Sequence, residues 1–411
     1  MSAPLPADRM NTGLGPVTGR GAPGRVAEVH AQTRRGLLVA AGFTVAAVVV
    51  GVARVGSGWW LPLHLFVVGG LLSAISATTQ MLAVTWSAAP SPRPVVVAAQ
   101  RWALAAGTVA LVVGRKTDRM WMFVAGGATV ILAMLALAWI LLRVRRQAVT
   151  DRFAPALEAY VAAVVAGAVG MSLGVVLGAG STGDRAAELR HAHLILNVFG
   201  LIGLVIAGTL PYFAATQVRS KMSRRATAVA MRVTFLALAA ATALAATGAI
   251  LDRSAVVAVG LISYALGLVA VAAMLPIYAT RRLRWGGPRV VQLLAGIVWW
   301  AAMTVALAVA AVRGSEDRVI LQALVIGGFA QILIASLAYL GPVLRGGGHQ
   351  RLTAGFAITN SWVSLAAGNT AAVAALAGQG PTLAVALAVW LTDFVARAAH
   401  LLAPTRSSDR V

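Results

Sequence analysis

The sequence predicts an all-α, polytopic membrane protein with about twelve transmembrane helices. Hydrophobic residues make up 59% of the 411 residues and charged residues only 11%, whereas soluble domains carry about 25% charged residues. Apolar segments recur along the chain, and they are long enough to cross a hydrocarbon layer of about 30 Å, which takes roughly 20 helical residues. We therefore expect the lipid bilayer to be the main surroundings of this chain.

The formal net charge of +22 has a different meaning in such a chain than in a soluble protein. The basic residues lie in short segments between the apolar ones, where Lys and Arg orient the helices across the bilayer. We therefore exclude a nucleic-acid-binding function. The chain has no Cys, which excludes thiolate metal sites, iron–sulfur clusters and disulfides and leaves His, Met, carboxylates and backbone groups as ligands.

In chain order, residues 1–35 are rich in Gly, Pro, Ala and Arg without apolar periodicity, and they predict a disordered basic arm. The membrane domain follows over residues 36–403, and residues 404–411 form a short tail. The first span has no small-residue cleavage site before it, so we interpret it as a retained anchor. The predicted spans are 36–54, 60–85, 97–114, 120–142, 155–180, 191–216, 228–250, 255–279, 290–312, 319–343, 353–378 and 381–403.

The distribution of basic residues predicts the topology. With a cytoplasmic amino terminus, twenty-four of the 34 Lys and Arg residues fall in inner segments and nine in outer segments. This asymmetry is typical of the positive-inside rule, and it places both termini in the cytoplasm of a multi-pass cell-membrane protein. Even-numbered spans then run inward, so His64, His191 and His193, which open the second and sixth spans, fall near the outer face.

An internal repeat indicates three four-helix units in a pseudo-threefold arrangement. Residues 63–80 align without gaps with residues 321–338, and both contain a Gly-Gly pair at the same offset. The sixth span offers a weaker variant between His193 and Gly200. Because these spans are four apart in the count, we expect three related units.

The sixth span carries the candidate site. His193, Asn197 and Gly200 follow at i, i+4 and i+7 and share one helix side, on which polar and small groups can face other helices instead of lipid. His191 is offset from His193 by about 200° and points elsewhere. The two histidines of this motif therefore cannot clamp one ion from a regular helix.

Two imidazoles on different helices could hold a cofactor together. His64 and His193 could bind one haem between the second and sixth spans, or a copper ion together with the thioethers of Met120 and Met122. The alternative interpretation is that the histidines are hydrogen-bonded helix ends or headgroup contacts, and that the two methionines are interfacial packing.

Two other polar clusters lie toward the predicted inner face. Asp393, Arg397 and His400 recur on one side of the last span, and we interpret them as a structural clamp or snorkelling cluster rather than a proton path. Glu158 begins the fifth span, where it is either a proton entry point or the partner of a loop arginine.

These features resemble the haem-copper oxidase subunit I superfamily, and more narrowly NnrS-type proteins and the membrane modules attached to some actinobacterial multicopper oxidases. The resemblance is carried by the stretches His64–Gly70, His191–Gly200, Gly208–Tyr212, Leu340–Pro342 and Arg351–Asn360. It implies that His64, His191 and His193 ligate haem iron or copper. We place Asn197 in the same cofactor site because it shares a helix side with His193. The resemblance also implies an electron-transfer or cupredoxin-type partner.

The resulting hypotheses belong to different classes. The first is a haem- or copper-binding redox membrane protein that resembles a reduced haem-copper oxidase subunit, and whether it is itself an oxidoreductase stays open. The second is a polytopic transporter of a small molecule or metal ion, which predicts helices broken at mid-membrane and inverted repeats. The third is a degenerate scaffold that assembles with a redox partner.

Overall fold

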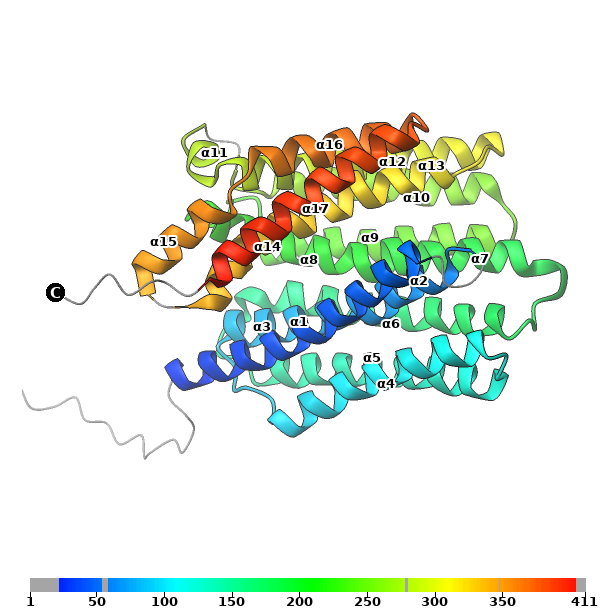
Figure 1. Cartoon of the computed structure of the whole chain (residues 1–411), viewed down its shortest axis with the longest axis horizontal. Coiled ribbons are helices and arrows are strands. Elements are labelled where there is room, and N and C mark those ends of the chain that lie inside the picture. Colours follow the sequence, from blue (N-terminus) through cyan, green and yellow to red (C-terminus); the bar gives the residue numbers. More distant parts are fainter. Residues whose placement is uncertain (1–21, 54–57, 278–279, 347, 404–411) are drawn as a thin grey trace, which may run out of the picture.

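The structure is a computed structural model, and it describes residues 22–53, 58–277, 280–346 and 348–403. These residues form helices and short connections without any strand. The long helices lie side by side in one bundle (Figure 1). Within the described residues, eleven helices are long and apolar enough to cross a membrane. The chain is therefore an all-α polytopic membrane protein.

The helices in the first half of the chain include two π-helical segments, η1 and η4. They are α1 (Ala22–Val52), α2 (Trp60–His64), η1 (Leu65–Leu71), α3 (Leu72–Ser87), α4 (Pro94–Lys116), α5 (Met120–Arg146), α6 (Ala154–Gly178), α7 (Ala186–Ile195), η4 (Leu196–Gly203) and α8 (Leu204–Gln217). Short 3-10 turns, η2 (Asp151–Phe153) and η3 (Gly183–Arg185), precede α6 and α7.

The second half of the chain contains a third π-helical segment, η5. Its helices are α9 (Ala228–Ile250), α10 (Ser254–Ala273), α11 (Thr280–Gly286), α12 (Pro288–Arg313), α13 (Arg318–Ala323), η5 (Leu324–Ala330), α14 (Gln331–Arg345), α15 (Gly348–Thr359), α16 (Trp362–Leu376) and α17 (Gly380–Leu402). Figure 1 shows α1 beginning and α17 ending at one end of the bundle, which we name the termini end. We name the opposite end, where α2 and α7 lie, the histidine end.

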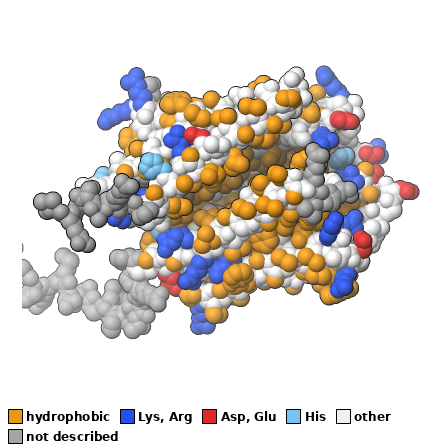
Figure 2. Space-filling view, in the orientation of Figure 1, with side chains coloured by type: hydrophobic (Ala, Val, Ile, Leu, Met, Phe, Trp, Pro, Cys, Tyr) orange, Lys and Arg blue, Asp and Glu red, His pale blue; other side chains and the backbone are white. Residues whose placement is uncertain are grey.

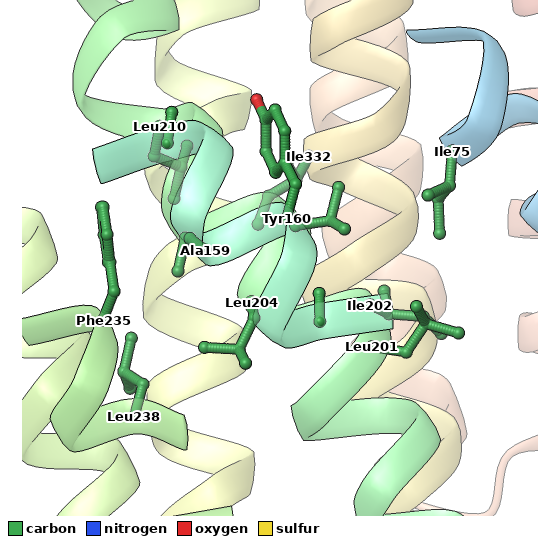
Figure 3. Close-up of a cluster of buried hydrophobic side chains, with 14 of the residues drawn as sticks. Ile75, Ala159, Tyr160, Leu201, Ile202, Leu204, Leu210, Phe235, Leu238 and Ile332 are labelled. Carbon is green, nitrogen blue, oxygen red and sulfur yellow. The ribbon is translucent and has the colours of Figure 1, made fainter. Parts of the chain in front are cut away.

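The surface and the core both fit a bilayer. Figure 2 shows apolar side chains across the middle of the bundle and Lys and Arg gathered toward its two ends. Large apolar side chains such as Leu236 and Leu266 are exposed by 68% and 66%, which a soluble surface avoids but lipid accepts. Inside, one continuous cluster runs from Ile75 on α3 through Tyr160 on α6 to Ile332 on α14 (Figure 3).

Two sequence-based boundaries differ from the structure. Helix α1 begins at Ala22, so residues 22–35, which we expected in the disordered arm, are helical; residues 1–21 and 404–411 lie outside the described residues. The predicted span 353–378 is wrong as a single helix, because α15 ends at Thr359 and α16 begins at Trp362. Neither helix reaches the eighteen residues of a candidate span, which leaves eleven.

The break between α15 and α16 has a local cause. Ser361 has an extended backbone (φ −144°, ψ 117°), and its side-chain oxygen accepts a hydrogen bond from the backbone N–H of Ser364. This is an N-cap, which satisfies one of the free N–H groups of a new helix. The sequence therefore starts a second helix where apolar composition alone suggested that the first one continued.

The π-helical segments recur in the three helices that the sequence repeat aligns. Segments η1 and η5 contain the two Gly-Gly pairs, and η4 contains Gly200. Aromatic contacts also join the corresponding helices at the termini end, since Trp86 of α3 lies against Tyr212 of α8 and Phe213 of α8 against Tyr339 of α14. The pseudo-threefold arrangement of three units stays a prediction.

The close packing of α4 and α5 gives a first test. A Cβ on Gly126 would lie 2.8 Å from the carbonyl oxygen of Gly107 and would also press against the backbone of Leu111. Gly126→Ala should therefore destabilise the protein by about 1–3 kcal/mol, measured as a lower thermal unfolding midpoint in detergent. Gly42→Ala is the control, because this exposed position has no atom within 4 Å and alanine favours a helix by about 1 kcal/mol. An unchanged midpoint in Gly126→Ala would contradict the packing.

Candidate functional site

His64 ends α2 at the histidine end and is held by its neighbour one turn back. Its ring stacks on Trp60 with centroids 4.2 Å apart. Its Nδ1 lies 2.8 Å from the backbone oxygen of Trp60, and because a carbonyl only accepts hydrogen bonds, Nδ1 must carry the proton. The other ring nitrogen, Nε2, then has a free lone pair. This is the arrangement that second-shell hydrogen bonds give to metal-ligating histidines.

His193 on α7 is fixed in the same way by a different helix. Its Nδ1 lies 2.7 Å from the backbone oxygen of Gly170 on α6 and 3.3 Å from the side-chain nitrogen of Asn197. Because the Gly170 contact is the shorter one and a carbonyl only accepts hydrogen bonds, Nδ1 carries the proton and Nε2 is left free. The Asn197 amide donates to the carbonyl of His193 at 2.7 Å. The imidazole occupies the space beside Gly174, where a Cβ would lie 2.6 Å from its Cε1. Glycines of α6 therefore make room for this side chain.

Aromatic side chains connect the two imidazoles. The Trp60 ring, which stacks on His64, lies 6.4 Å from the ring of Phe123 on α5. Phe123 in turn packs against Gly178, one turn along α6 from the glycine that borders His193. The structure thus places His64 and His193 in one layer at the histidine end.

Both histidines precede a π-helical segment. His64 is directly followed by η1, and His193 lies three residues before η4. A π-turn changes the hydrogen-bond register and shifts every later side chain around the helix axis, and such turns occur frequently at functional sites. The π-helical segments therefore lie in the same region in which the histidines predicted a functional site.

Other predicted ligands do not join this pair. His191 is exposed on α7, as its angular offset predicted. Met120 is 41% exposed and Met122 is half-buried, and the α5 residue that reaches the histidine layer is Phe123. Within the described residues, no group of three His, Asp or Glu side chains is arranged to hold a metal ion.

The fold and composition define the class of the protein: a multi-pass, all-helical membrane protein in contact with lipid. The chain matches no protein-family model, and no curated protein matches it. The function must therefore be argued from the residues themselves.

The cluster at the end of α17 serves the structure. Arg397 donates to the Asp393 carboxylate and to the backbone oxygens of Ile358 and Asn360, each at 2.8 Å. These carbonyls lie at the end of α15, where an interrupted helix leaves acceptors without partners. The pair therefore clamps the break, in agreement with our structural interpretation, while His400 is exposed and apart from it.

Glu158 is paired rather than free. Its carboxylate accepts two hydrogen bonds from Arg232 of α9, at 2.8 and 3.0 Å, and lies 3.8 Å from Arg145 of α5. The partners belong to helices, not to a loop as we expected. The ion pairs join α5, α6 and α9 at the termini end.

Sequence reasoning missed a polar pocket between α1, α3 and α4. Ser76 and Gln80 bond to Gln100, while Ser73 Oγ and Gln80 Oε1 are buried without a hydrogen-bond partner among the described residues. Arg101 also lines this cavity of about 10 Å³, which has room for about one water molecule. The spacing of Ser73, Ser76 and Gln80 at i, i+3 and i+7 could have predicted this polar face.

The clamp at α17 gives a second test. Arg397→Met leaves two helix-end carbonyls and the Asp393 carboxylate without their donor, and it should cost about 2 kcal/mol. A lower thermal unfolding midpoint would measure this loss. Arg318→Met, at an exposed position that starts α13, should change stability by less than about 0.5 kcal/mol. Equal midpoints for the two variants would show that the break does not depend on the clamp.

Proposed function

We propose that this chain is a redox metalloprotein of the membrane in which His64 and His193 hold a copper ion near the histidine end. The observation that carries this proposal is that both imidazoles are protonated and hydrogen-bonded at the same ring nitrogen. Each Nδ1 donates to a backbone carbonyl, so both rings keep the Nε2 lone pair that a metal requires. Neither Nε2 has a hydrogen-bond partner among the described residues.

The surroundings of the pair favour an ion over a porphyrin. Trp60, Phe123 and Val175 belong to one packed apolar cluster around this layer, and they fill space that a haem would need. Two neutral nitrogen ligands leave the whole charge of the ion uncompensated. Because the energy of a charge in an apolar medium rises with the square of that charge, monovalent Cu(I) fits better than a divalent ion.

The resemblance to haem-copper proteins gives the redox role. Imidazole nitrogen binds both common oxidation states of copper, and a bound copper would supply one-electron transfer. The chain's own residues would fix the two rings through Trp60 and Gly170 and exclude water through the aromatic layer. An electron-transfer or cupredoxin-type partner would meet the histidine end, which the positive-inside rule places outside the cytoplasm, with both chain termini inside.

Metal analysis of the purified protein tests this function. After loading with Cu(I), His64→Ala and His193→Ala should each lower copper affinity by roughly 100-fold or more, since even outer-shell changes cost about 10–100-fold. His191→Ala is the matched control, because this exposed histidine lies two residues from His193 and should leave binding unchanged. Visible absorption of the same samples tests the haem alternative.

Each result that would contradict the copper site supports a different conclusion. Equal copper binding by the wild type and the His64→Ala/His193→Ala double variant would refute the copper site. A haem spectrum that disappears in the same variants would move the assignment to haem. A wild type that binds neither, but still co-purifies with a redox partner, would support the scaffold hypothesis.

A transporter is the second candidate, and the polar pocket between α1, α3 and α4 favours it. Ser73 and Gln80 present oxygen atoms without partners inside a transmembrane helix, and intramembrane polar groups often line substrate routes. The broken helix does not add support, because Arg397 caps its end and lies near the termini end, not at mid-membrane. Loss of uptake in Ser73→Ala/Gln80→Leu, with copper binding intact, would favour this candidate.

A further inference from the structure

A basic pocket lies at the termini end, away from the histidines. It forms between the segment that follows α8 and the short helix α11, and its volume is about 790 Å³. Figure 1 places α11 at this end of the bundle. The lining residues are Val218, Arg219, Ser220, Lys221, Arg281, Arg282, Arg284 and Trp285. The volume lies in the range of about 300–1,000 Å³ that is typical of ligand sites.

The charge of this pocket is uncompensated. Five of its eight lining residues are cationic. The sequence contains no Asp or Glu from residue 189 to residue 251, nor from 253 to 315, so neither lining segment carries an acidic residue. In the described part of the chain, the ion pairs of other arginines involve none of these five cations. Five like charges around one cavity repel one another unless an anion joins them.

One of these cations is held in a strained backbone position. Arg219 has a φ of +47°, and it occupies the left-handed position after α8 where glycine is usual. The backbone N–H of Ser220 bonds to the carbonyl of Ala215, which closes the helix end. A side chain at this position strains the backbone. The conformation directs the guanidinium over the Trp285 ring, 4.6 Å from its centroid.

A buried arginine adds positive charge beside the pocket. Arg289 is only 2% exposed, and one guanidinium nitrogen donates to the carbonyl of Gln217 at 3.4 Å. It lies over the rings of Tyr339 and Phe356. Its Nε and Nη1 have no hydrogen-bond partner among the described residues. Gln217 directly precedes the lining residue Val218, so Arg289 places a further positive charge behind the wall of the pocket.

We propose that this pocket binds a phosphate-bearing headgroup with two or more negative charges. Guanidinium groups match phosphate oxygens in paired hydrogen bonds, and four of the five cations are arginines. Trp285 is 41% exposed beside the charges, and an aromatic ring at a helix end is typical of the membrane interface. The same chemistry could come from an anionic lipid of the adjoining leaflet or from a soluble polyphosphate, and basic pockets of this kind bind lipid headgroups in other membrane proteins.

The test uses the full chain and two probes. Native mass spectrometry would measure retention of cardiolipin, which has two phosphates, and calorimetry in neutral detergent would measure binding of inorganic pyrophosphate. The triple variant Arg281→Gln/Arg282→Gln/Arg284→Gln should weaken the binding of whichever probe the wild type binds by about tenfold or more. A tenfold change in affinity corresponds to about 1.4 kcal/mol. The control, Arg93→Gln/Arg143→Gln/Arg146→Gln, removes the same charge at the same end but outside the pocket.

Arg219→Gly separates a binding role from a structural role. Glycine relieves the left-handed strain, so this variant should have an equal or higher unfolding midpoint while it binds the probe more weakly. Binding of cardiolipin alone would assign a lipid, and displacement of cardiolipin by pyrophosphate would assign a soluble ligand. The proposal would be overturned by the absence of binding in both arms, or by equal affinity of the wild type, the pocket variant and the control variant.

Discussion

The structure depends on one constraint: in a bilayer, backbone N–H and C=O groups must find partners within the protein. Long α-helices satisfy this rule by themselves, so any departure from regular helix has to be compensated. This chain departs in two ways, through the segments η1, η4 and η5 and through the break between α15 and α16. At the break, the side chains of Ser361 and Arg397 supply the missing partners, while η1 and η4 each follow a histidine.

The polar side chains beside the two kinds of departure have different roles. At the break, Arg397 supplies charged donors to two carbonyls of α15, so the irregular backbone is closed and inert. Just before η1 and η4, the imidazoles of His64 and His193 bond with one nitrogen to backbone oxygens of α2 and α6 and keep the other nitrogen free. The guanidinium of Arg397 is committed to these acceptors, whereas each imidazole keeps one ring nitrogen as a ligand atom. This contrast is why the candidate site belongs at the histidine end.

The sequence predicted the features that depend on composition and angular spacing. The spans and the divergence of His191 from His193 followed from hydropathy and from about 100° per residue. It could not predict the break at Ser361, because an N-cap depends on local backbone angles inside an apolar run. The register shift of the π-helical segments has no compositional sign apart from their glycines. The pocket around Ser73 also depends on residues of α1 and α4. Periodicity within α3 does not show which helices pack against its polar side.

The two ends of the bundle differ in charge, and they lie far enough apart for a charge at one end to have little effect on the other. The histidine layer holds neutral rings in an apolar cluster, while the termini end concentrates arginines, including the buried Arg289. About 30 Å of membrane separates the ends, and at an effective dielectric constant near 20 two unit charges at that distance interact by only about 0.5 kcal/mol. A ligand charge bound at one end therefore changes the other end little through the field alone. Any stronger coupling between them would have to pass through a movement of the helices.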